Sequence, residues 1–157
     1  MDQIQKVYIE TSVWGMTLPR QPRALRQPSL EFLRQCRLGI FEPYISTVVL
    51  DEVQEAKAPR ANRILAEIER HHLSVLEPTR EAERLADEYV KAEIIPRKKH
   101  DDAMHVAIAT VFQMDVLVSW NQRHLVNVRK KQLFITVNRL AGHEHEILIH
   151  TPFEVLR

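Results

Sequence analysis

The segment Val7-Tyr8-Ile9-Glu10-Thr11-Ser12-Val13 places three consecutive apolar residues directly before an acidic residue and two hydroxyl residues. Its β-branched and aromatic side chains do not alternate with polar ones, which predicts a short strand buried on both faces. Further short apolar runs at 44–45, 73–76, 116–118 and 147–149 predict four more strands of this kind.

Helical patterns lie between these runs. Helices are predicted at 29–38, 48–56, 60–71, 80–93, 101–112 and 128–140. The connection 19–28 holds three prolines and three arginines, so we expect it to be irregular, and we expect 96–100 to be a charged loop. Short buried strands interleaved with helices predict an α/β fold, an α/β/α sandwich with a central, mostly parallel sheet.

Composition limits the class of protein. A chain of 157 residues is expected to form a single domain over 1–157, and a formal charge of +1 does not by itself indicate a nucleic-acid partner. The single cysteine excludes an internal disulfide and a zinc site built from several thiolates. No apolar run approaches the ~20 residues that span a bilayer, and the first residues do not resemble a signal peptide. We therefore expect a cytoplasmic protein with no membrane contact.

Acidic and amide side chains follow the predicted strands. Glu10 ends the first strand, Glu52 lies in the helix after the second, Asp102 opens the alanine-rich helix, and Asn121 follows the strand 116–118. Because ligands bind beyond the carboxyl ends of parallel strands, we expect these side chains to gather at one edge. Clustered carboxylates repel each other, and their hard oxygen atoms favour Mg²⁺ or Mn²⁺ as the compensating cation.

Each acid also has a purely structural interpretation. An acid at a strand end is usually a solvated turn residue, Asp102 can complement the helix dipole, and Glu52 can lie on a solvated face. Asp101 is left out of the set, because adjacent helical residues point about 100° apart. The joint placement of the acids at equivalent ends of successive units favours the functional interpretation.

Four blocks of the sequence together resemble a PIN domain, and most closely the VapC-like toxin ribonucleases of type II toxin–antitoxin operons. The blocks come in family order, at residues 7–13, 46–53, 102–109 and 117–121. The run Ser-Trp-Asn-x-x-His-Leu at 119–125 is similar to one subgroup of that branch, and Thr-Pro-Phe-Glu at 151–154 also fits.

This resemblance implies a Mg²⁺- or Mn²⁺-dependent endoribonuclease that acts on RNA, is inhibited by a small antitoxin protein and forms a homodimer. Carried over by position, Glu10, Glu52 and Asp102 are the acids of the catalytic and metal site, and Asn121 takes the place of a fourth acid. The sequence departs from the family at Glu10, where Asp is more usual, and at Asn121, which carries no charge. The number of metal ions is therefore left open, and so is a catalytically weak binding module for RNA or a partner protein.

Neighbouring polar residues are candidates to support the acids. Thr11, Ser12 and Ser119 can hydrogen-bond a carboxylate or metal-bound water, and helix capping is the alternative for the first two. His105 lies one helical turn after Asp102 and can share its face, or it can be an ordinary buried histidine. Trp120 can stack on a base or pack beside the site.

The basic run Arg97-Lys98-Lys99 immediately precedes Asp102. Such runs are usually solvated surface, but its position beside the acids makes it a candidate for binding RNA phosphates. The pairs His71-His72 and His143-x-His145 lack the spacing of a helical zinc site. No Gly-x-Ser-x-Gly elbow and no phosphate-binding glycine loop occurs in the sequence.

Overall fold

A computed structural model describes residues 3–157. Five strands form one parallel sheet in the order β3-β2-β1-β4-β5, and their bounds are β1 Gln5–Ile9, β2 Phe41–Ser46, β3 Ser74–Leu76, β4 Val116–Val118 and β5 Leu148–His150. Val7, Tyr8 and Ile9 in the central strand are fully buried, as the unalternating run predicts. The predicted α/β fold with a central parallel sheet is confirmed.

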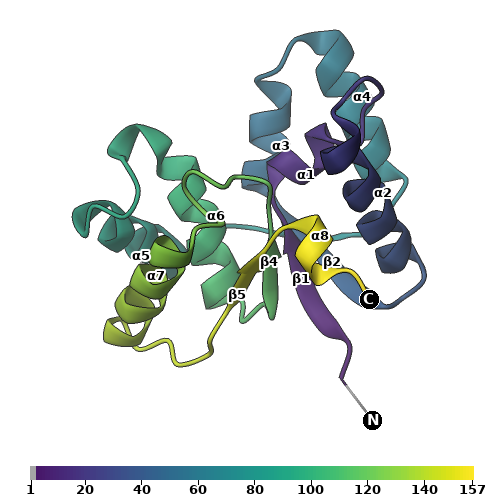
Figure 1. Ribbon diagram of the computed structural model, residues 1–157. Helices are drawn as coiled ribbons and strands as arrows, with labels where there is room; N and C mark the ends of the chain where they lie inside the picture. The colour runs from purple at the N-terminus through teal and green to yellow at the C-terminus, as the bar shows by residue number, and fades with distance from the viewer. Residues whose placement is uncertain (1–2) are drawn as a thin grey trace.

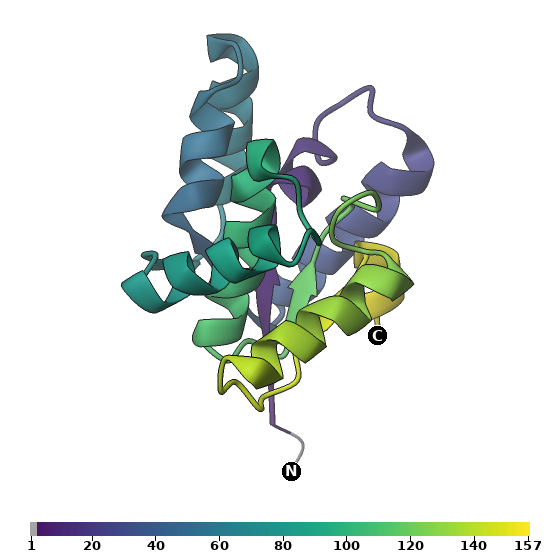
Figure 2. The ribbon, with the colours of Figure 1, turned by 90° about the vertical axis from the view of Figure 1, so that its left-hand side faces the viewer.

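Helices cover both faces of the sheet. Their bounds are α1 Thr11–Gly15, α2 Arg23–Arg37, α3 Thr47–Gln54, α4 Ala58–Glu69, α5 Arg80–Lys91, the 3₁₀ turn η1 Arg97–Lys99, α6 His100–Val111, α7 Val128–Leu140 and α8 Pro152–Val155. Figure 1 shows α5, α6 and α7 on one side of the sheet and α2 with α8 on the other. Helices α3 and α4 pack together and project above the edge where the strands end (Figures 1 and 2).

The helix α2 begins earlier than the sequence predicts. It starts at Arg23 and contains Pro28, whereas the segment up to Pro28 was expected to be irregular. Pro28 removes one helical hydrogen bond, but Arg26 inside this first part donates to the carbonyl oxygens of Thr17 and Leu18 at 3.2 and 3.0 Å. This tertiary anchoring holds the early turns in place. The charged loop at 96–100 likewise contains the 3₁₀ turn η1.

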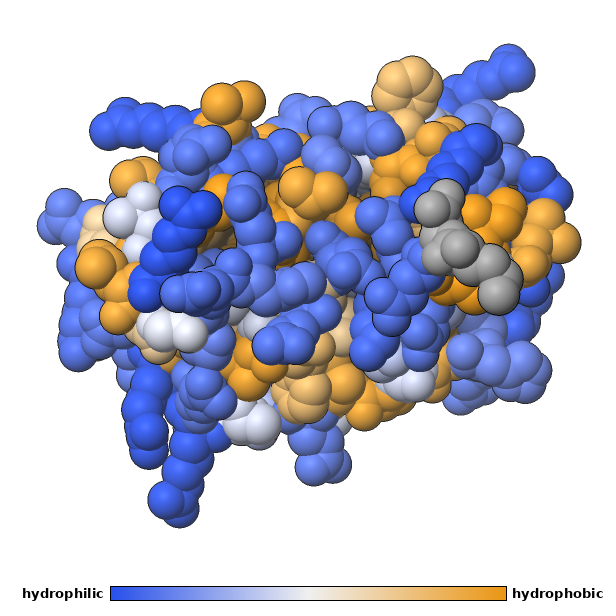
Figure 3. All heavy atoms as spheres, turned by 90° about the horizontal axis from the view of Figure 1, so that it is seen from below, coloured by the Kyte–Doolittle hydropathy of each residue, from blue (hydrophilic) through white to orange (hydrophobic). Residues whose placement is uncertain are grey.

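The molecule has two different ends along the strand direction. All strands run the same way, so their carboxyl ends meet at one edge, near α1 and the start of α3. Figure 3 shows the opposite end, where the strands begin and hydrophilic side chains surround small apolar patches. Within residues 3–157, no helix is both long and apolar enough to cross a membrane.

Candidate active site

The carboxyl edge of the sheet carries the three predicted acids on three different elements. Glu10 follows β1 and caps α1, Glu52 lies on α3 after β2, and Asp102 lies in the first turn of α6. The strands β2 and β4 both pair with β1, so the segments that follow them converge on the end of the central strand. Asn121, three residues beyond the end of β4, approaches the same edge.

Glu10 is the most enclosed of the acids, with 4% of its surface exposed. The backbone N–H of Ser12 donates to Oε2, and the Ser119 hydroxyl donates to Oε1 over 3.2 Å. Burial raises the pKa of Glu10, while the nearby charge of His105 and the bonds from Ser12 act against the rise. Two of the three predicted hydroxyl neighbours, Ser12 and Ser119, therefore lie beside this acid, and the bond from Ser12 comes from its backbone.

Glu52 is held from two sides. The Thr11 hydroxyl donates to Oε1 over 2.9 Å, and the His105 ring nitrogen Nε2 donates to the same oxygen. Burial alone would raise the pKa of Glu52, but the bond and charge of His105 and the bond from Thr11 bring it below its ordinary value. The charge of Lys99 acts in the same direction, so this member of the basic run lies close enough to influence the acid.

Asp102 is half-buried, whereas the adjacent Asp101 is exposed. Burial raises the pKa of Asp102, and the Asn121 side chain acts against this rise. The negative charge of Glu52 raises the pKa of Asp102 further, so the two carboxylates repel each other. Asn121 Oδ1 also accepts a hydrogen bond of 3.0 Å from the backbone of His124, which fixes the amide beside the acid.

His105 connects the three acids. The ring is completely buried on α6. Its positive charge lowers the pKa of Glu10, Glu52 and Asp102. Burial would lower the pKa of His105, but the bond to Glu52 and the surrounding negative charges raise it above its usual value. His105 is therefore a buried histidine that also contacts a predicted site residue, Glu52.

The residues present fit a hard divalent cation held by few protein ligands. Among residues 3–157, no three His, Cys, Asp or Glu side chains are spaced to enclose one metal ion. Mg²⁺, however, is usually bound by one or two carboxylates, with water and substrate phosphate completing its octahedron. The repulsion between Glu52 and Asp102 is what a cation between carboxylates would relieve. The oxygen donors thus suit Mg²⁺ or Mn²⁺ and do not suit a metal that needs a full cage of protein ligands.

Two basic groups near Asp102 were not among the predicted site residues. His124 is 8% exposed, and its charge acts on the aspartate, as does that of Lys130 on α7. Lys130 Nζ donates to the Ile94 carbonyl oxygen over 2.9 Å and approaches His124 Nδ1 at 3.4 Å. His124 belongs to the run 119–125, and Lys130 belongs to the basic sequence Arg129-Lys130-Lys131. Their positions in these two motifs are the feature of the sequence that could have marked them as site candidates.

Trp120 packs beside the site. Its ring is partly buried against the core, and Nε1 donates to the Ser29 hydroxyl over 2.8 Å. Its backbone N–H donates to Ser12 Oγ over 2.9 Å. This geometry favours the packing interpretation over base stacking.

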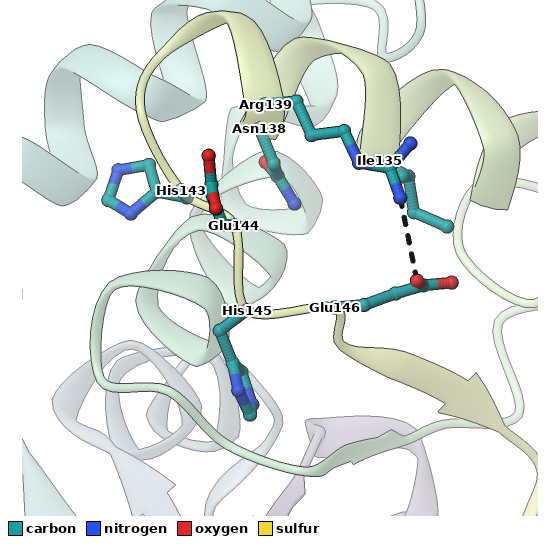
Figure 4. Close-up of a pocket in the computed structure, with 7 residues that line it drawn as sticks. All are labelled: Ile135, Asn138, Arg139, His143, Glu144, His145 and Glu146. Atoms are coloured by element: carbon teal, nitrogen blue, oxygen red, sulfur yellow. Dashed lines mark ion pairs between the residues drawn. The ribbon is translucent and has the colours of Figure 1, made fainter.

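The histidine pairs lie away from the acids. Figure 4 shows a shallow hollow beside the end of α7, lined by Ile135, Asn138, Arg139, His143, Glu144, His145 and Glu146. The two histidines there bind different partners: His143 pairs with Glu81 at 3.3 Å, and His145 donates to the Met114 carbonyl oxygen over 2.9 Å. An ion pair of 3.6 Å joins Arg139 and Glu146 across the hollow. None of the predicted site residues lines this hollow.

Solved structures identify the fold. A chain of "VapBC2 from Rickettsia felis bound to a DNA fragment from their promoter" superposes with a TM-score of 0.57 and 14% identity, over 93% of this chain and 98% of that chain. The chain has a PIN-like fold. A chain of "FitAB bound to IR36 DNA fragment" gives the same TM-score of 0.57 at 13% identity, over 96% and 98% of the two chains.

The PIN-like resemblance seen in the sequence is thus confirmed at the level of the fold. The PIN-like arrangement extends over nearly the whole length of the chain, from β1 to α8. No family model and no curated protein sequence matches the chain. Activity must therefore be argued from the residues at the carboxyl edge.

Proposed function

We propose that the chain is a Mg²⁺- or Mn²⁺-dependent endoribonuclease, the toxin of a type II toxin–antitoxin pair. The observation that carries the proposal is the meeting of Glu10, Glu52 and Asp102, from three elements, around the buried His105. Buried like charges raise the free energy of the apo protein, and a site that binds a cation gains from them.

Each group has a distinct task in this proposal. Glu52 and Asp102 supply oxygen ligands, with Glu10 and Asn121 as the remaining candidates. These oxygens would hold a divalent ion, which would supply Lewis-acid activation of water and neutralise charge on the phosphate. The Thr11 hydroxyl and the His105 ring hold the Glu52 carboxylate in one orientation. Lys99, with Arg97 and Lys98 before it, attracts the RNA backbone to the edge.

The partners follow from the resemblance. VapC-like proteins act with a small antitoxin, and the two similar structures are described as VapBC2 and FitAB bound to DNA fragments. We propose the same kind of protein partner and a homodimer for this chain. Acting on RNA, it would work in the cytoplasm.

The test compares two adjacent aspartates. Asp102→Asn and Glu52→Gln should lower metal-dependent RNA cleavage at least 100-fold, while Tm stays the same or rises because carboxylate repulsion is relieved. Asp101→Asn is the matched control: it removes the same charge one position away, on an exposed side chain, and should cut RNA normally. A folded Asp102→Asn protein with wild-type activity would refute the proposal.

The second candidate is a catalytically weak PIN-fold module that binds RNA or protein. The uncharged Asn121 and the lack of a preformed three-ligand metal site in residues 3–157 favour it. The two candidates differ in one measurement. The enzyme cuts RNA with Mn²⁺ and stops with EDTA, whereas the module binds RNA equally well under both conditions and leaves it intact.

A further inference from the structure

Tyr8 has an unusually well-connected hydroxyl. The residue lies in the central strand β1 and is completely buried. Its hydroxyl shares hydrogen bonds with Ser46 Oγ at 2.7 Å and with His105 Nδ1 at 2.6 Å. A phenolic hydroxyl can both donate and accept, so the two bonds use both capacities and join Tyr8 to Ser46 before α3 and to His105 on α6.

The hydrogen bonds continue from Tyr8 to the candidate site. His105 is completely buried, and its second nitrogen, Nε2, bonds Glu52 Oε1. An ionised carboxylate only accepts hydrogen bonds, so Nε2 carries the proton and points at Glu52. With Nδ1 held by the tyrosine hydroxyl, the ring has one orientation in which both nitrogens are satisfied.

Ser46 shows that this network displaces a more ordinary contact. The residue occupies the N-cap position of α3, where a serine side chain commonly bonds a helical N–H. Its side chain makes no such bond, and its hydroxyl turns to Tyr8 instead. Because a serine cap ordinarily stabilises a helix, the bond to Tyr8 takes the place of a favourable contact.

The network also closes on itself. Ser46 occupies the position before the first turn of α3 and Glu52 lies further along that helix, while His105 lies on α6, three positions after Asp102. The hydrogen bonds therefore run from the start of α3 through β1 and α6 back to α3. Such a loop ties the helix that carries Glu52 to the helix that carries Asp102.

We infer that Tyr8 is a positioning residue, which acts through His105 to hold the Glu52 carboxylate at a fixed place relative to Asp102. The inference rests on the proposed function, since it assigns Tyr8 to the metal-binding carboxylates of that site. Tyr8 is completely buried, and its hydroxyl reaches Glu52 only through His105. Ligand-orienting partners of this kind typically contribute 10- to 100-fold to metal affinity or activity.

The chain provides a matched control in Tyr89. That tyrosine is also completely buried, and its hydroxyl donates to Asn138 Oδ1 on α7. Its ring packs edge-on against Phe134, away from the acids. Tyr8→Phe and Tyr89→Phe therefore remove the same atom from equally buried rings, and only the first touches the network.

The experiment measures three quantities in wild type, Tyr8→Phe and Tyr89→Phe. Calorimetric titration with Mn²⁺ alone gives metal affinity, steady-state cleavage gives kcat and KM, and nitrogen NMR of the metal-free protein at one pH gives the state of the His105 ring. Both variants should lose comparable Tm. Tyr8→Phe alone should weaken Mn²⁺ binding about 10-fold, lower kcat with KM for RNA unchanged, and shift the His105 nitrogen signals.

Equal Mn²⁺ affinity and kcat in the two variants would overturn the inference and make Tyr8 a structural core residue. Ser46→Ala keeps the tyrosine and removes only its second partner, so it tests the network if Tyr8→Phe does not fold. It should shift the same signals and weaken Mn²⁺ binding less. A wild-type protein that neither binds Mn²⁺ nor cuts RNA refutes the proposed function. Unchanged His105 signals in a folded Tyr8→Phe or Ser46→Ala protein refute the positioning role separately.

Discussion

The Thr11 hydroxyl donates a hydrogen bond to Glu52 Oε1 over 2.9 Å, although 41 positions separate the two residues in the chain. The bond joins the first turn after β1 to the helix after β2, and it meets the oxygen that also accepts from His105. One carboxylate oxygen is therefore held by two donors from different elements. The orientation of Glu52 is set by the fold and does not depend on a metal ion.

This relationship predicts the effect of removing one donor. Thr11→Val keeps the shape of the side chain and loses its hydroxyl, so the free energy of unfolding should fall by about 1 kcal/mol. Mn²⁺ affinity should fall several-fold, because Glu52 then has only His105 to orient it. Thr11→Ser retains a donor and should stay close to wild type in both thermal unfolding and calorimetric titration. Identical results for Val and Ser would show that the bond has no functional role.

The basic run beside the acids should govern the salt dependence of RNA binding. Replacing Arg97, Lys98 and Lys99 with alanine should weaken binding and flatten the slope of log affinity against log salt. Lys99→Ala alone should reduce that slope by about 1. Cleavage at saturating RNA should change much less, since the carboxylates are untouched.

A control for this measurement lies at the other end of the sheet. Arg70 follows α4 where the chain enters β3, and Arg70→Ala should leave the salt slope unchanged. Equal slopes for Lys99→Ala and wild type would place the RNA path elsewhere on the surface.

The sheet could be predicted from the sequence because its signals are local. The strands β1 and β4 are short unalternating apolar runs and are buried as predicted, and Glu10 follows β1 directly. The edge strands β3 and β5 were predicted to be buried on both faces, but each is partly exposed because it has only one neighbouring strand. The short helix α8 could also have been found, since Thr151 and Glu154 form a capping box there. The early start of α2 could not, because it is stabilised by Arg26, whose guanidinium bonds the carbonyl oxygens of Thr17 and Leu18 in the preceding turn, and the sequence pattern does not show that contact.

The acids could be predicted from the sequence, but the hydrogen-bond network of Tyr8 and His105 could not. Glu10, Glu52 and Asp102 carry a chemical signature wherever they stand, so their gathering could be proposed from strand ends alone. Tyr8 carries no such signature, because a tyrosine in an apolar strand is ordinarily a core residue. Its partner His105 is 97 positions away, and only the packing of α6 on β1 brings the two rings to 5.7 Å.

We expect the protonation of His71 to make the free energy of unfolding depend on pH. Its Nε2 accepts from Arg37 Nη1 at 2.8 Å, and its Nδ1 donates to the Glu67 carbonyl oxygen at 2.9 Å, so the folded ring must be neutral. Burial lowers the pKa of His71, and the charge of Arg37 adds to this. The unfolded chain therefore binds a proton first as pH falls below about 6.5.

The contribution of His71 to the free energy of unfolding should be fully present above the pKa of the unfolded chain. It should be lost as pH falls toward the lower pKa of the folded protein. His71→Gln should show a smaller loss of Tm between about pH 7 and pH 5 than wild type. His72→Gln removes the adjacent, exposed histidine and should keep the wild-type slope. A steeper slope in His71→Gln would contradict the neutral tautomer.

Asn121 gives the sharpest test of the site's charge. The amide lies beside Asp102, where it opposes the rise in that group's pKa, and its Oδ1 accepts from the His124 backbone. Asn121→Asp keeps this acceptor and turns the favourable amide into a like charge. The metal-free protein should then lose about 1 kcal/mol of stability, because a fourth carboxylate joins three that already repel each other.

Mn²⁺ should reverse that penalty. The three carboxylates contribute about −3 and the His105 ring among them offsets part of it, so the site matches one divalent ion better than two, and a second ion would bind mainly together with an RNA phosphate. Asn121→Asp should therefore raise Mn²⁺ affinity without RNA and move the cleavage optimum to lower metal concentration. Calorimetric titration at equal ionic strength measures the Mn²⁺ affinity. Tm measured in EDTA and in Mn²⁺ shows whether the metal-free protein loses stability and regains it with the ion. If affinity, stoichiometry and Tm all match wild type, Asn121 lies too far from the metal to belong to the site.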